Sequence, residues 1–80
     1  MLKFAYTFNN PCYFSETYLV VQFKPNGAYY LFTEQESFVA TFNETPTNGW
    51  KQLNGRILSE LLLLDLGGFV QRHFFTHKFI

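Results

Sequence analysis

The alternation of apolar and polar residues predicts three strands in the first part of the chain. Residues 2–8 alternate without a break: Leu2, Phe4, Tyr6 and Phe8 on one face, and Lys3, Ala5 and Thr7 on the other. This pattern is typical of a strand with one buried face. Residues 17–24 (TYLVVQFK) and 28–32 (AYYLF) are rich in β-branched and aromatic residues, which favours two more strands.

The segment Pro25-Asn26-Gly27 predicts a hairpin between the second and third strands. Proline suits the first central position of a turn and Gly27 tolerates positive φ, which favours a three-residue loop with Phe23 opposite Tyr29. A two-residue loop would exchange the faces of Tyr29 and Tyr30 relative to the second strand. In either register both faces of the hairpin are apolar, which is unusual for an antiparallel sheet with one face in water.

The segment 33–43 predicts a helix, with a strand as the alternative. Thr33 followed by Glu36 forms a capping-box pattern, so we expect a helix over residues 34–43 that ends before Pro46. The alternation of Phe38, Ala40 and Phe42 would equally suit a strand. Residues 45–55, with two Asn-Gly pairs, predict a loop.

The last third of the chain predicts a helix followed by a strand. Residues 56–66 are leucine-rich, with Asn54 as the expected N-cap and Gly67-Gly68 as the expected C-terminal stop. Residues 69–80 alternate in a Phe-rich pattern that favours a strand. We therefore expect one α+β domain over residues 1–80, in the order β-β-β-α-α-β: a four-stranded antiparallel sheet with two helices on one face.

Aromatic residues make up 21% of the 80 residues, which is more than one small core needs. The surplus predicts a surface that contacts a partner. Tyrosine, tryptophan and arginine are the types most enriched at interface hot spots, and a leucine in the polar face of a helix also suggests a covered surface. The expected interface residues are Tyr18, Tyr29, Tyr30, Trp50, Leu63 and Arg72.

Charge and cysteine content narrow the class of partner and the compartment. Six basic and six acidic residues give a formal net charge of zero, without the basic excess that duplex binding requires. Near-neutral charge favours association, so the expected partner is another protein, including a second copy in a homodimer. The sequence has one cysteine, Cys12, and it shows neither a signal-peptide pattern nor a long apolar run. These features predict a cytoplasmic protein without a membrane segment.

The sequence offers no set of catalytic or metal-binding residues. Cys12 lacks a local signature of nucleophilic catalysis. His73 and His77 would lie roughly 13 Å apart on a strand, too far to share a metal. The glycines form no phosphate-binding loop. We therefore expect no enzyme activity, cofactor, metal site or small-molecule ligand.

These features predict a small non-enzymatic protein-interaction module. Its size and class suggest an inhibitor or adaptor of a larger host protein, of the kind that phages and mobile elements encode. The alternative is a binder of single-stranded nucleic acid, in which Tyr18, Tyr30 and Phe32 stack bases on one face of the sheet.

Overall fold

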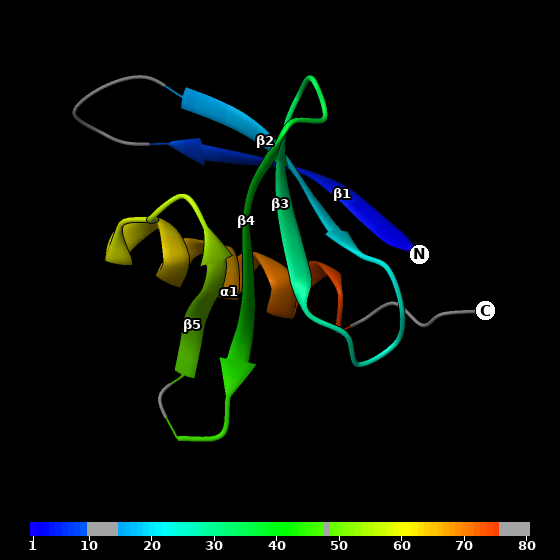
Figure 1. Cartoon of the computed structure of the whole chain (residues 1–80), viewed down its shortest axis with the longest axis vertical. Coiled ribbons are helices and arrows are strands. Elements are labelled where there is room, and N and C mark those ends of the chain that lie inside the picture. Colours follow the sequence, from blue (N-terminus) through cyan, green and yellow to red (C-terminus); the bar gives the residue numbers. More distant parts are fainter. Residues whose placement is uncertain (10–14, 48, 76–80) are drawn as a thin grey trace.

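A five-stranded antiparallel sheet is followed along the chain by one helix. The computed structural model describes residues 1–9, 15–47 and 49–75. Its elements are β1 (Leu2–Asn9), β2 (Ser15–Gln22), β3 (Tyr29–Thr33), β4 (Phe38–Thr45), β5 (Gly49–Gly55) and α1 (Glu60–His73). The strands lie in the sheet in chain order, and each is antiparallel to the next, so the sheet is a meander (Figure 1).

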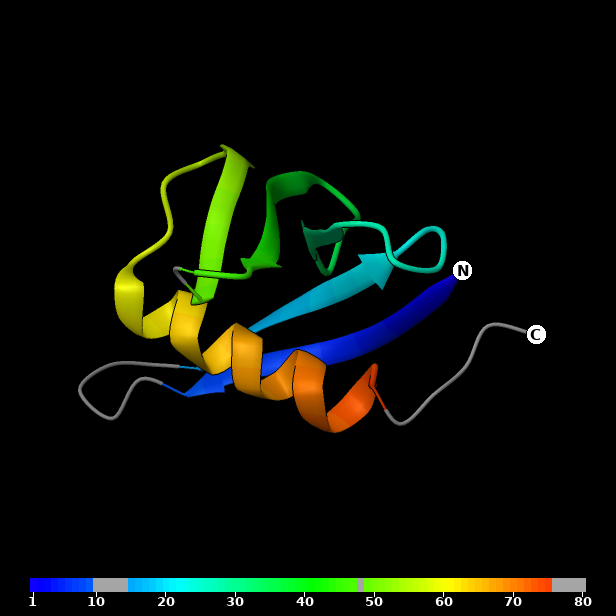
Figure 2. The ribbon, with the colours of Figure 1, turned by 90° about the horizontal axis from the view of Figure 1, so that it is seen from below.

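The expected four-stranded sheet with two helices is therefore wrong. The domain is α+β, but a fourth and a fifth strand occupy the segments expected to be a helix and a loop. Helix α1 lies against one side of the twisted sheet (Figure 2). The core between them contains Tyr6, Tyr18, Val20, Tyr29, Leu31, Ala40 and Phe42 from the strands, and Leu62, Leu66, Phe69, Val70 and Phe74 from the helix and its C-cap.

Strand β1 confirms the predicted alternation. Its apolar residues face α1, with Tyr6 only 2% exposed, whereas Lys3, Ala5 and Thr7 are exposed. The polar outer face made the period of two visible in the sequence.

The expected helix over residues 34–43 is wrong, because Thr33 caps a hairpin turn. The Glu36 N–H donates to the Thr33 carbonyl oxygen at 2.9 Å, and the Ser37 N–H donates to the Thr33 side-chain hydroxyl at 3.1 Å. Glu36 adopts a φ of 66°, which turns the chain back into β4. A threonine hydroxyl that accepts a backbone N–H serves a turn as well as a helix start. The alternative strand, with Ala40 and Phe42 on the buried face, is the observed structure.

Residues 49–55 form the edge strand β5 instead of the expected loop. The strand ends at Gly55, which has a φ of 95°. A Cβ atom there would lie 2.4 Å from the carbonyl oxygen of Val39, so glycine permits both the conformation and the close approach to β4. The glycines of the two Asn-Gly pairs that suggested a loop, Gly49 and Gly55, are the first and last residues of the strand.

Helix α1 starts and ends later than expected. Its N-cap is Ser59, whose hydroxyl accepts the Leu62 N–H at 3.1 Å, and not Asn54. The helix continues through Gly67 and Gly68 to His73, so the expected strand over residues 69–80 is wrong for its described part. Residues 76–80 lie outside the described residues.

The hairpin between β2 and β3 has a longer connection than either predicted loop. Gln22 lies opposite Tyr29, so the predicted pairing of Phe23 with Tyr29 is wrong. The Gly27 N–H donates to the Lys24 carbonyl oxygen at 3.1 Å, and Asn26, with a φ of 63°, takes the left-handed position that was expected for glycine. The resulting register places Tyr29 on the helix side and Tyr30 on the opposite side.

The sheet and the helix approach each other closely at Trp50 and Gly67. A Cβ atom on Gly67 would lie 2.3 Å from Cδ1 of the Trp50 indole and 2.5 Å from Nε1. The absence of a side chain at Gly67 therefore lets the indole of β5 pack directly on the helix backbone. Gly68 differs, because its Cβ would meet only the end of the flexible Arg72 side chain, at 3.1 Å.

This difference predicts opposite effects for two neighbouring substitutions. Gly67→Ala should lower the free energy of unfolding by about 1–3 kcal/mol, because the new methyl group displaces the indole. Gly68→Ala should raise it by up to about 1 kcal/mol, because alanine favours the helix. Urea unfolding followed by circular dichroism measures both, and equal effects of the two substitutions would contradict this account of Trp50.

Candidate functional site

An aromatic cluster occupies the side of the sheet that α1 does not cover. We call this side the open face; its outward-pointing strand residues are Lys3, Ala5, Leu19, Val21, Tyr30, Phe32, Phe38 and Thr41. Tyr30 is at the centre of the cluster, with ring centroids 5.0 Å from Phe23, 6.5 Å from Phe32 and 6.5 Å from Phe38. Phe23 and Phe38 are each 50% exposed, so half of each ring surface remains in contact with water.

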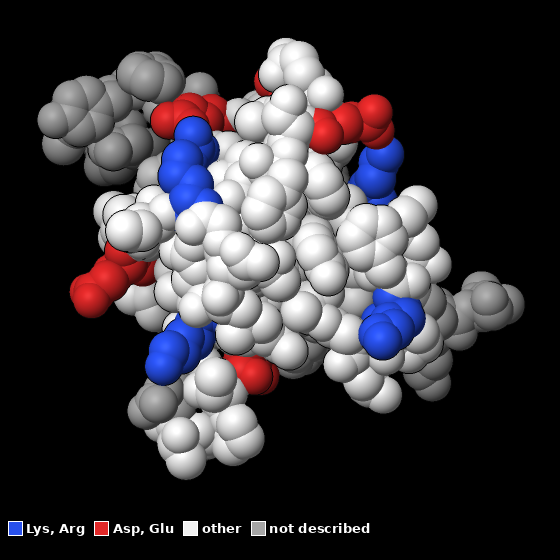
Figure 3. Space-filling view, in the orientation of Figure 1, with Lys and Arg blue, Asp and Glu red and all other residues white. Residues whose placement is uncertain are grey.

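Charges lie around the open face and not within its centre. Figure 3 shows the molecule from the side of β3 and β4 away from the helix, with no Lys, Arg, Asp or Glu in the middle of the view. Charged residues of both signs lie at the margin of this view. Lys3, on the edge strand β1, forms an ion pair with Glu36 at 3.6 Å. A depression of about 200 Å³ lies beside this pair and is lined in part by Phe23 and Phe32.

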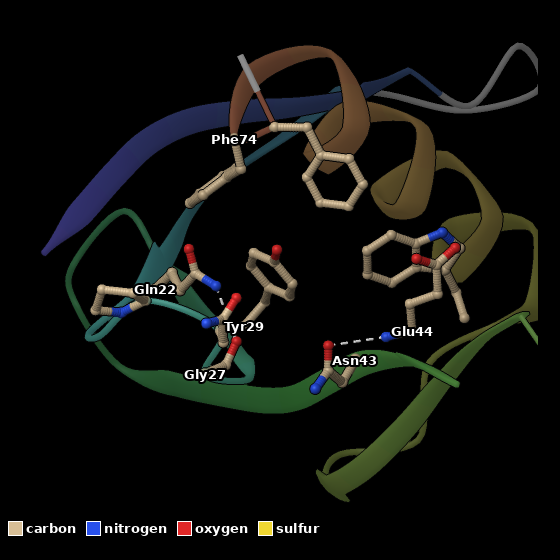
Figure 4. A pocket seen from close by; sticks show the side chains of 10 residues that line it. Gln22, Gly27, Tyr29, Asn43, Glu44 and Phe74 are labelled. Atoms are coloured by element: carbon tan, nitrogen blue, oxygen red, sulfur yellow. Dashed lines mark hydrogen bonds between the residues drawn. The ribbon is translucent and has the colours of Figure 1, made fainter. Parts of the chain in front are cut away.

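A larger cavity, of about 710 Å³, opens on the helix side of the sheet. It lies between the turn at residues 25–27, the strands β3 to β5 and the C-terminal end of α1 (Figure 4). Tyr29 projects into it from β3, with its ring centroid 5.2 Å from that of Phe74 and 5.8 Å from that of Trp50. Glu44, from β4, lines the same cavity.

Three tyrosine hydroxyls on the helix side have raised pKa values. Burial is the largest cause for Tyr6, and the carboxylate of Asp65, which accepts the Tyr6 hydroxyl at 2.5 Å, raises the pKa further. Burial also raises the pKa of Tyr18, and its hydrogen bond to Glu16 adds to the shift. For Tyr29 burial again raises the pKa; a hydrogen bond with Gln22 opposes the shift, and the charge of Glu44 adds to it.

The structure separates the expected interface residues. Tyr18 and Tyr29 are 5% and 6% exposed on the helix side, whereas Tyr30 lies on the open face. The platform of Tyr18, Tyr30 and Phe32 proposed for nucleic acid is therefore split between two faces. Trp50 is half-buried against α1.

The two expected interface residues of α1 differ in burial. Leu63 is half-buried against the core, and Arg72 is exposed near the helix end.

The helix and the segment before it add a second exposed apolar surface. The outer side of the segment 57–64 carries Ile57, Leu61 and Leu64, which are 91%, 60% and 68% exposed. The leucine-rich pattern predicted a helix that is either buried or covered by another chain. In the structure its buried stripe is displaced toward the C-terminus and contains Leu62, Leu66, Phe69 and Val70.

The described residues contain no group of three or more His, Cys, Asp or Glu side chains placed to hold a metal. His73 is the last residue of α1, and its ring packs 4.4 Å from that of Phe69. Cys12 and His77 lie outside the described residues.

The cavity was missed because four separate segments build it and none carries a local motif. The unusual aromatic content was the only signal in the sequence.

Among the described residues, no helix is long and apolar enough to cross a membrane. No protein-family model, curated protein or solved structure matches this chain. The physical features of the surface therefore carry the functional argument.

The tyrosine environments predict a loss of stability at alkaline pH. Because the folded-state pKa of Tyr6 lies above the value of about 10 in an unfolded chain, its stabilising effect is complete below pH 10 and is lost as the pH rises further. Tyr6→Phe should reduce the slope of unfolding free energy against pH by up to about 1.4 kcal/mol per pH unit.

Asp65→Asn gives a graded comparison, because it removes the charge but keeps an acceptor for the Tyr6 hydroxyl. Its slope should lie between those of Tyr6→Phe and the original protein, since burial is the larger cause of the shift. Chemical denaturation at several pH values from 8 to about 11 provides the measurement. An unchanged slope in Tyr6→Phe would show that this hydroxyl does not carry the effect.

Proposed function

We propose that this protein is a non-enzymatic protein-interaction module and that its open face is the docking surface. The observation that carries the proposal is the aromatic cluster around Tyr30, uncharged at its centre and ringed by charges of both signs. Aromatic side chains surrounded by a polar margin are typical of interface hot spots.

The size of the cluster supports a specific interface. Two half-exposed phenylalanines leave roughly 200 Å² accessible, given that a whole aromatic side chain contributes about 150–250 Å². A standard interface buries about 800 Å² on each partner, so Phe23 and Phe38 would supply about a quarter of it. The depression beside Phe32 could receive a side chain from the partner.

The proposed occupant is a second copy of this chain. A net charge of zero means that two copies do not repel each other over long range. The margin carries both signs, as at Lys3 and Glu36, so a two-fold arrangement can bring each charge near its opposite. A cytoplasmic location is part of the proposal, and a single cysteine is consistent with a reducing compartment.

A role as an inhibitor or adaptor of a larger protein, of the type found in phages and mobile elements, belongs to the same proposal by analogy of size and class. In that role the homodimer would be the form that acts. The absence of charge at the centre of the open face favours a protein over single-stranded nucleic acid, which needs cationic contacts along its backbone.

Light scattering coupled to size exclusion tests the proposal. The original protein should have about twice its monomer mass of 9.4 kDa. Phe38→Lys places a charge in the aromatic cluster and should weaken the dimer at least tenfold. Leu64→Lys is the matched control, because Leu64 is exposed to a similar extent but lies on the helix, and it should remain dimeric.

Three outcomes would overturn the proposed dimer. One is a monomer at every concentration up to about 1 mM, a weak limit for specific association. The second is a dimer that Phe38→Lys leaves intact. The third is a dimer that Leu64→Lys weakens at least as much as Phe38→Lys does, which would assign the interface to the exposed helix surface.

A further inference from the structure

We propose that the cavity at the C-terminal end of α1 is a binding site for a small organic cation, such as an alkylated ammonium group. This site lies on the helix side of the sheet and is independent of the open face. It would give the protein a ligand in addition to a protein partner.

The size and walls of the cavity suit such a ligand. Its volume of about 710 Å³ falls within the range of small-molecule sites, about 300–1,000 Å³. Aromatic side chains from three different segments line it: Tyr29 from β3, Trp50 from β5 and Phe74 at the helix end (Figure 4). The rings of Tyr29 and Phe74 meet at an interplanar angle of 83°, and those of Tyr29 and Trp50 at 58°. Tyr29 and Phe74 pack edge to face and are only 6% and 3% exposed, so the ring faces open to a cation are those of the half-buried Trp50 and of Phe75, which is 57% exposed and also lines the cavity.

The charge on the described lining residues favours a cation over an anion. Among the described residues that line the cavity, Glu44 is the one carboxylate and none is lysine or arginine. Glu44 lies opposite Trp50 in the pairing of β4 with β5, so the carboxylate and the indole belong to the same wall. Its charge also reaches the Tyr29 hydroxyl, which places negative potential near the ring that projects into the cavity.

The helix adds to this potential. α1 ends at His73, and the C-cap Phe74 lines the cavity. The C-terminal end of a helix carries a partial negative charge of about half an elementary charge, which favours cations within the last turn. Aromatic faces, a carboxylate and a helix C-terminus therefore act together. Polar side chains of Gln22 and Asn43 complete the lining and can contact the hydroxyl or amide groups of a ligand.

Trp50, the only tryptophan of the chain, reports binding directly. The probe is choline, and 3,3-dimethylbutan-1-ol is its neutral control of the same shape. We expect choline to change the Trp50 fluorescence in a saturable way with a dissociation constant on the order of 1 mM, and the neutral alcohol to bind at least fivefold more weakly.

Two matched variants locate the effect. Glu44→Gln should weaken choline binding about fivefold, which corresponds to about 1 kcal/mol, while leaving the exposed strand position polar. Glu34→Gln removes an exposed charge from the turn between β3 and β4, outside the lining, and should bind choline as the original protein does. Amide chemical shifts of Gly27 and Asn43 give a second readout that does not depend on fluorescence.

The proposal is overturned if choline produces no saturable change up to about 50 mM, a concentration well above the expected constant. It is also overturned if the neutral alcohol binds as tightly as choline, or if Glu34→Gln weakens binding as much as Glu44→Gln. The oligomeric state has no part in these outcomes, so they are independent of the proposed dimer.

Discussion

The structure depends on the direct packing of the Trp50 indole on the backbone of α1 at Gly67. A helix of 14 residues is about 21 Å long, and it is the one helix available to cover a five-stranded sheet among the described residues. To cover the sheet from β1 to β5 it must lie close to the edge strand, and a side chain at Gly67 would hold it away. The opposite edge is joined to the helix by the hydrogen bond between Tyr6 and Asp65.

Both proposed sites exist because, in the described residues, a single helix covers the sheet. One helix can cover only one side of the sheet, so the side that carries Tyr30 and Phe38 remains in water although it is aromatic. The helix also does not cover the whole of the other side. The cavity beside Tyr29 lies between the last turn of α1 and the turn at residues 25–27. The two surfaces are therefore on opposite sides of the same sheet, and a ligand at one need not compete with a partner at the other.

Sequence patterns predicted the first three strands. β1 was correct because its outer residues are polar, and the β2–β3 hairpin was recognised from its composition. The register failed because Asn26, and not Gly27, adopts the positive φ. α1 was predicted too early in the chain because several of its leucines, which were expected to be covered, are exposed. Gly67 does not end the helix but lies within it, where it contacts the distant strand β5. The cavity depends on such distant contacts throughout, and so no local pattern could reveal it.

The meander order has a consequence for how the chain folds. Each strand pairs with the strand that precedes it, so most contacts join residues close in sequence, and loop-closure entropy is small at every step of sheet formation. The contacts of α1 with the sheet are the exceptions, for example the hydrogen bond between Tyr6 and Asp65, which are 59 residues apart. A sheet of this topology should fold quickly for its class, at a rate governed by the pairing of neighbouring strands. The packing of α1 then determines which side of the sheet is buried.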